Sequence, residues 1–138
     1  MSDAQMKRIL QTARTVASVG VSSNPAKPGY GVVAYLKSQG YHIIPINPRG
    51  GEILGEKVYV DLASIPEPVD VVQLFRPSEE VMPYVQQAIH IGAKVVWMQE
   101  GISNEEAAQA ARAAGLEVVM DQCMRVSHRR LIGERFAL

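Results

Sequence analysis

The chain has 138 residues, of which 47% are hydrophobic and 20% are charged, so it can bury one core of the size typical of a single domain. Fourteen lysines and arginines balance fourteen aspartates and glutamates, which excludes the broad electrostatic field that draws a protein to nucleic acid or to an anionic membrane. The single cysteine, Cys123, excludes an internal disulfide, and no apolar run approaches the ~20 residues that span a bilayer, so we expect a cytoplasmic protein.

Helices and strands are predicted in alternation from the start of the chain. Residues 3–14 carry an apolar stripe typical of an amphipathic helix, and Ser2 can cap it. Residues 15–20 (TVASVG) are uncharged and rich in β-branched side chains, as in a parallel strand that is buried on both faces. Helical spacing returns over residues 30–39, where Gly40 can close the helix. Residues 41–46 (YHIIPI) predict the second strand, although a proline is unusual in a central strand.

The second half of the chain continues the alternation. Residues 47–57 predict a loop, and residues 58–60 a short strand or a turn. A strand at 69–75 precedes a helix from Ser78 to Gly92, and a strand at 94–98 precedes a helix that ends at Gly115. Ser103 and Glu106 form a capping-box pattern for that helix. A last strand at 116–120 leaves a short helix and tail. We therefore predict one doubly wound, Rossmann-like α/β domain over residues 1–138, with a mostly parallel sheet and helices on both faces.

The turn after the first strand is a candidate phosphate site. In a doubly wound sheet this turn offers free backbone N–H groups and the positive end of a helix dipole. Gly20, Ser22 and Ser23 are small enough to let an anion reach the main chain, and Lys27 adds a positive charge. The same small residues also suit an ordinary strand-to-helix turn. Lys27 favours the anion site.

The ligand expected from these residues is an adenine nucleotide with a pyrophosphate and a further ribose phosphate. The turn lacks the G-x-G-x-x-G pattern of an NAD site, because it runs GVSSNP over residues 20–25. An NAD site also presents Asp or Glu after the second strand, where this chain has Asn47, Pro48 and Arg49. An amide and a guanidinium favour a phosphorylated ribose. NADP and coenzyme A both fit.

Four short motifs together resemble a known family. They are GVSSN with Lys27, INP at 46–48, VDVVQLFRP at 69–77 and WMQEG at 97–101. In this order, at the ends of successive strands, they resemble the small stand-alone CoA-binding proteins, which are similar to the CoA-binding N-terminal domain of the succinyl-CoA synthetase α subunit. The resemblance extends from near residue 10 to near residue 130. In the synthetase subunit, a phosphorylated histidine in a following domain carries the chemistry, and we expect this protein to lack that domain.

The resemblance implies that the chain binds coenzyme A or an acyl-CoA without catalysis of its own. The backbone of residues 21–24 would meet the pyrophosphate, and residues 47–49 would surround the adenosine and its ribose phosphate. Residues 75–77 would flank the adenine or the start of the pantetheine arm, with Gln99 and Gly101 near that arm. The expected cofactor-binding residues are Gly20, Val21, Ser22, Ser23, Asn24, Lys27, Asn47, Pro48, Arg49, Phe75, Arg76, Pro77, Gln99, Gly101 and Cys123.

Other functions remain open on the sequence. Cys123 is either a small buried hydrophobe or a thiol that forms a mixed disulfide with CoA. An NADP-dependent oxidoreductase fragment is one alternative, and an acyl-CoA-using enzyme with Cys123 or His128 as nucleophile or base is another. No metal site is expected, because the three histidines lack metal-ligand spacing. The arginine-rich tail lacks the aromatic platform of a nucleic-acid site, so we expect a solvated helix face or a subunit contact in a homo-oligomer.

Overall fold

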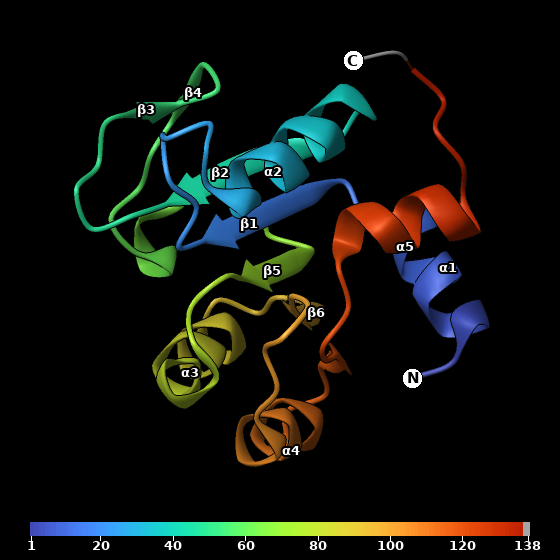
Figure 1. Cartoon of the computed structure of the whole chain (residues 1–138). Coiled ribbons are helices and arrows are strands. Elements are labelled where there is room, and N and C mark those ends of the chain that lie inside the picture. The colour runs from blue at the N-terminus through green and yellow to red at the C-terminus, as the bar shows by residue number, and fades with distance from the viewer. Residues whose placement is uncertain (137–138) are drawn as a thin grey trace.

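A single parallel sheet organises the molecule (Figure 1). The computed structural model describes residues 1–136. The sheet contains β1 (Thr15–Val19), β2 (His42–Ile46), β5 (Val71–Leu74), β6 (Val95–Met98) and β7 (Glu117–Val119). Their order across the sheet is β2-β1-β5-β6-β7, and every pair is parallel. The predicted Rossmann-like α/β fold is therefore confirmed.

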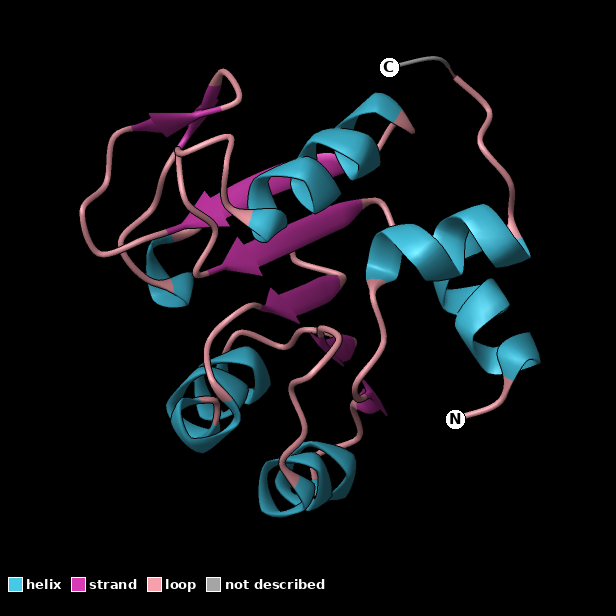
Figure 2. Cartoon of the chain, in the orientation of Figure 1, coloured by secondary structure: helices cyan, strands magenta, loops and turns pink. Residues whose placement is uncertain are grey.

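Helices cover both faces of this sheet (Figures 1 and 2). One face carries α1 (Asp3–Thr12), α2 (Pro28–Ser38) and α5 (Met124–Leu131), and the other carries α3 (Met82–His90) and α4 (Glu105–Ala113). Each side has its own apolar core, with Trp97 and Tyr35 in the first and Leu74 and Met98 in the second. The uncharged strands are buried on both faces, as predicted for a parallel sheet.

The segment between β2 and β5 has more structure than the predicted loop. It contains a short antiparallel hairpin, β3 (Glu52–Ile53) and β4 (Glu56–Lys57), and a 3-10 turn, η1 (Leu62–Ser64). Residues 58–60 contribute one parallel bridge, between Tyr59 and Ile46. Since β2 is an edge strand of the main sheet, Pro45 is tolerated there, and its carbonyl accepts a hydrogen bond from the Tyr59 amide.

The side chain of Lys37 ties this hairpin to α2. Its Nζ atom lies 3.2 Å from the Glu56 carboxylate of β4 and also donates to the carbonyl of Leu54 at the hairpin tip. Leu54 has a left-handed backbone, with φ of 53°. The hairpin is therefore fixed against the last turns of α2, on the β2 side of the sheet.

The start of α4 differs from the sequence prediction. Ser2 caps α1 with a capping box as expected, but the box predicted at Ser103 and Glu106 is wrong. Asn104 is the cap, because its Oδ1 accepts from the Ala107 amide at 2.9 Å. Its Nδ2 donates to the carbonyl of Ser78, the first residue of the 3-10 turn η2 (Ser78–Glu80) that precedes α3. The cap residue of α4 thus also joins the loop before α4 to the loop before α3.

Within residues 1–136, no helix is long and apolar enough to cross a membrane. Over the same range, no group of three or more His, Cys, Asp or Glu side chains is placed to hold a metal ion.

Candidate functional site

A cavity of about 640 Å³ opens beyond the carboxyl ends of β1, β2 and β5. Strands β1 and β5 are neighbours, but the helices that follow them, α2 and α3, cover opposite faces of the sheet. This is the switch point at which doubly wound sheets bind ligands. The cavity is lined by Val19, Gly20, Ser22, Ser23, Ile46, Asn47, Pro48, Arg49, Gly50, Gly51, Glu52, Ile53, Val60, Arg76 and Tyr84.

The turn between β1 and α2 forms one wall. Gly20 has a φ of +88°, and its amide donates to the carbonyl of Ile46, which joins the ends of β1 and β2. Within the turn, the Ser22 hydroxyl accepts from the Asn24 amide at 3.0 Å, and Asn24 Oδ1 accepts from the Ala26 amide at 2.9 Å. The turn then enters α2 with no side-chain cap on the first amides. An uncapped helix N-terminus beside small residues favours an anion.

Asn47 joins this turn to the second wall. Its Nδ2 donates to the Val21 carbonyl at 3.2 Å, and its Oδ1 accepts from the Arg49 amide at 2.9 Å. Both polar ends of the side chain are therefore used inside the protein. Arg49 is exposed at the cavity and makes no ion pair within residues 1–136. Of these residues, Arg49 is the one free to pair with an anion.

Arg76 contributes the third wall, after β5. One guanidinium nitrogen, Nη2, donates to Glu80 at 3.0 Å. Its Nε is buried and has no hydrogen-bond partner in the described part of the chain. A buried donor without a partner is costly, so a ligand oxygen at this position would stabilise the side chain.

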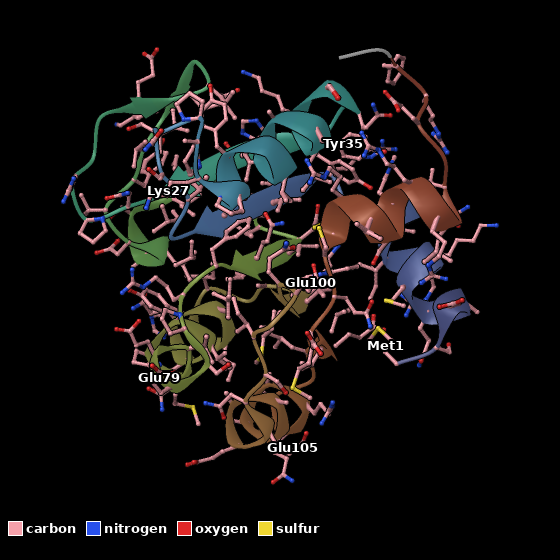
Figure 3. The ribbon with its side chains drawn as sticks, in the orientation of Figure 1. Met1, Lys27, Tyr35, Glu79, Glu100 and Glu105 are labelled. Carbon is pink, nitrogen blue, oxygen red and sulfur yellow. The ribbon has the colours of Figure 1, made fainter. Side chains whose placement is uncertain are left out.

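Eight of the expected cofactor-binding residues do not line the cavity. Phe75 turns toward α2, where a Cβ built on Gly29 would lie 3.2 Å from the Phe75 ring. Lys27 is exposed at the start of α2 (Figure 3), outside the cavity. Val21 is buried in the core and contributes its backbone carbonyl. The residues outside the lining are Val21, Asn24, Lys27, Phe75, Pro77, Gln99, Gly101 and Cys123.

Gln99 belongs to a buried chain of amides. Its Oε1 accepts from Gln73 Nε2 at 3.1 Å and from the Met124 amide at 3.0 Å. Gln73 Oε1 in turn accepts from the Ser18 hydroxyl at 2.8 Å. This chain crosses β1, β5 and β6 and ends at the first residue of α5. Gln99 therefore has a structural role.

Gly101 and Cys123 lie at the rim formed by the loops after β6 and β7. The Gly101 amide donates to Asp121 Oδ1 at 2.6 Å. Cys123 is half-buried at the N-cap position of α5 and packs against the same core as Phe75 and Tyr30. This rim continues from the cavity toward β7, so the cavity and the loops that carry Gly101 and Cys123 lie along the same edge of the sheet.

Sequence reasoning missed the apolar wall of the cavity. Tyr84 of α3 lines it together with strand-end and hairpin residues, namely Val19, Ile46, Ile53 and Val60. Glu52 of the hairpin adds a carboxylate. The helix predicted after β5 contains Tyr84 without marking it as a lining residue, and the contributions of Glu52, Ile53 and Val60 depend on how residues 50–60 fold back over β2.

The chain is similar in sequence and fold to known proteins. Residues 14–129 match a family model described as a CoA binding domain. Over 127 residues, the chain is 39% identical to uncharacterized protein YneT of Bacillus subtilis. The aligned region covers 92% of this chain and 94% of YneT. A solved hypothetical protein from Pyrococcus horikoshii superimposes with a TM-score of 0.93 at 41% identity, covering 96% of this chain and 94% of that one.

A longer enzyme also contains a similar segment. The acetate–CoA ligase [ADP-forming] II of Archaeoglobus fulgidus is 33% identical over 95 residues. The match covers 67% of this chain but 14% of the ligase. The chain therefore corresponds to a small part of that enzyme.

Proposed function

This chain belongs to the CoA-binding domain family, and on that premise we propose that it binds coenzyme A or an acyl-CoA at the carboxyl ends of β1, β2 and β5. Residues 1–138 would form one such domain. The observation that supports this most is the cavity of about 640 Å³, which brings a small-residue turn, two arginines and an aromatic side chain to one place. Its volume lies within the range of about 300 to 1,000 Å³ typical of ligand pockets.

Each part of the nucleotide has a suitable neighbour. The diphosphate would lie against the turn at residues 20–23 and the N-terminus of α2, with Arg76 donating from the side. The adenine would pack on Tyr84 and the apolar wall, and the ribose phosphate would pair with Arg49. Lys27 would act through its charge from outside the cavity. The pantetheine arm would follow the rim past Phe75 and Gly101 toward Cys123.

The geometry favours binding over catalysis. His128 is buried, and its Nδ1 lies 2.7 Å from the Tyr35 hydroxyl. The ring lies near residues that precede β1 and β2, which places it at the opposite end of the sheet from the cavity. In the described part of the chain, no hydrogen bond links Cys123 to a base. A nucleophile needs a base within hydrogen-bond reach, so we propose an accessory binding role. Self-association through α5 stays a prediction.

Isothermal titration with CoA, dephospho-CoA and NADP tests this proposal. We expect CoA to bind, NADP to give no saturable heat, and dephospho-CoA to bind roughly ten- to a hundredfold more weakly, because a charged contact contributes roughly 1.5 to 3 kcal/mol. Arg49→Gln should remove the difference between CoA and dephospho-CoA. Arg112→Gln, an exposed arginine paired with Glu105 on α4, serves as the control. Saturable binding of NADP without CoA binding would replace the proposal with the oxidoreductase alternative.

A further inference from the structure

A second, smaller hollow lies at the opposite end of the sheet from the cavity. Its volume is about 60 Å³. Arg14 comes immediately before β1 and Tyr41 immediately before β2, so the hollow faces the amino ends of these strands. It is lined by Leu10, Gln11, Ala13, Arg14, Gln39, Gly40, Tyr41, His128, Ile132 and Arg135.

His128 provides a buried ring nitrogen at this hollow. The residue is 3% exposed, and its ring packs edge-on against Tyr35 and Tyr41, with centroid distances of 5.4 and 5.8 Å. Nδ1 is engaged with the hydroxyl of Tyr35, which is not part of the lining; Figure 3 shows Tyr35 on α2. Within residues 1–136, Nε2 makes no hydrogen bond, and the protein does not fully enclose this atom. The Nε2 edge is therefore what His128 presents to the hollow.

The charged groups that line the hollow are both cationic, and Gln11 adds an uncharged amide at its edge. The Tyr41 hydroxyl already donates to the Leu10 carbonyl at 2.5 Å. Gln39 holds the C-terminal segment, because its Nε2 donates to the Phe136 carbonyl and its Oε1 accepts from the Arg135 amide. Among residues 1–136, no carboxylate lines the hollow.

Neither Arg14 nor Arg135 makes an ion pair in the described residues. Two guanidinium groups without counterions therefore flank the free nitrogen of a buried imidazole. Arg125 and Arg129 add positive charge near Tyr35, and Glu134 acts on Tyr35 from outside the lining. The balance of charge around the hollow is positive.

We propose that this hollow binds a phosphate-sized oxyanion, with His128 Nε2–H and the guanidinium groups of Arg14 and Arg135 as donors. The hollow holds a few water molecules, which is room for one tetrahedral oxyanion. Binding requires the tautomer in which Tyr35 donates to Nδ1 and the proton is on Nε2. Because Arg135 belongs to the segment held by Gln39, a bound oxyanion would join that segment to the start of β1.

Titration of the full chain with inorganic phosphate, followed by NMR of its ¹⁵N-labelled histidine rings at constant ionic strength, tests this site. We expect saturable shifts of the His128 ring nitrogens, a spectrum of the Nε2–H form, and a rise of the His128 pKa on binding. His42 and His90 are exposed and serve as internal references. The double variant R14Q/R135Q should weaken binding at least tenfold, whereas R130Q should not, because Arg130 pairs with Asp3 on α1.

Three results would overturn the site. They are a His128 response that grows linearly with phosphate, an equal response to chloride, and an unchanged affinity in the double variant. If the double variant does not fold, the wild-type titration against chloride still decides. None of these outcomes depends on coenzyme A, so the site can fail while the proposed function stands.

Discussion

Arg76 lies directly over Gly20: a Cβ atom built on Gly20 would be 2.9 Å from Cδ of Arg76. The two residues follow neighbouring strands, and the absence of a side chain on Gly20 lets Arg76 reach across the end of β1. The backbone of Gly20, with φ of +88°, also suits glycine best. Position 20 therefore requires glycine for two reasons, the space that Arg76 occupies and the left-handed backbone.

We expect Gly20→Ala to lower the free energy of unfolding by roughly 1 to 3 kcal/mol and to weaken CoA binding, since Arg76 must move. Urea denaturation and calorimetric titration measure the two effects. Gly40→Ala is the matched control, because Gly40 has a similar φ of +98° but no atom within 4 Å of the added Cβ. Equal CoA affinity in wild type and Gly20→Ala would show that the position of Arg76 is irrelevant to the ligand.

The side chain of Asn47, which joins the turn after β1 to the loop after β2, should contribute to the stability of the fold. Asn47→Ala removes both of its side-chain hydrogen bonds, so we expect a loss of about 1 to 3 kcal/mol in stability. Asn47→Asp keeps the acceptor for the Arg49 amide but adds a negative charge beside the proposed ribose phosphate. CoA should therefore bind Asn47→Asp more weakly than Asn47→Ala in a titration. The reverse order would contradict the placement of that phosphate.

The buried hydrogen bonds of Gln99 predict that its substitution lowers the free energy of unfolding more than substitution of an exposed glutamine does. Gln99→Leu leaves Gln73 Nε2 and the Met124 amide without their acceptor, which should cost about 1 to 3 kcal/mol in urea denaturation. Gln109→Leu changes an exposed glutamine on α4 and should have little effect. A loss of CoA affinity in Gln99→Leu with unchanged stability would instead indicate direct contact with the ligand.

The environment of His128 predicts loss of stability in mild acid. Burial, with a smaller effect of Arg135, lowers the pKa of His128 below its ordinary value of 6.5. As the pH falls below about 6.5, the unfolded chain binds a proton that the folded chain does not, so stability falls until the pH reaches the lower folded pKa. Urea denaturation at pH 7.5 and 5.5, without phosphate, should show a smaller loss in His128→Gln than in wild type. Equal losses would mean that other groups carry the acid sensitivity.

Cys123 offers a test of where the end of the pantetheine arm lies. If the arm follows the rim, the Cys123 thiolate can attack oxidised CoA disulfide, giving a protein–CoA mixed disulfide and releasing one CoA thiol. Intact-mass analysis should show one CoA adduct that a reductant removes and that Cys123→Ser lacks. A wild-type protein that gains no adduct would place the thiol end elsewhere.

The order of strands and helices followed from local patterns, and so did the edge of the sheet at which the cavity forms. Uncharged strands such as residues 71–74 are distinctive, and Gly40 and Gly92 end helices with the expected left-handed backbone. Because carboxyl ends of parallel strands meet at one edge, motifs after successive strands had to lie near one another.

The side-chain directions could not be inferred in the same way. Phe75 continues the alternation of β5 and faces Gly29 of α2 on the same side of the sheet as Val71, whereas Arg76 faces the cavity, and nothing in the local spacing shows which of the two reaches the ligand site. The contact of Asn104 Nδ2 with the Ser78 carbonyl joins residues that lie 26 positions apart. Tertiary contacts of this kind leave no trace in local spacing, and the same holds for the hairpin that supplies the apolar wall.

Lys37 gives the cavity an unexpected mechanical property. This residue grips the β3–β4 hairpin from the last turns of α2, while the first turn of the same helix ends the loop at residues 20–27. The hairpin and the loop at residues 20–27, which form two sides of the opening, are thus attached to the same helix, α2. A sliding movement of α2 along its axis would displace both sides in the same direction, so a substitution of Lys37, about two and a half helical turns from the start of α2, would release the hairpin from the loop at residues 20–27.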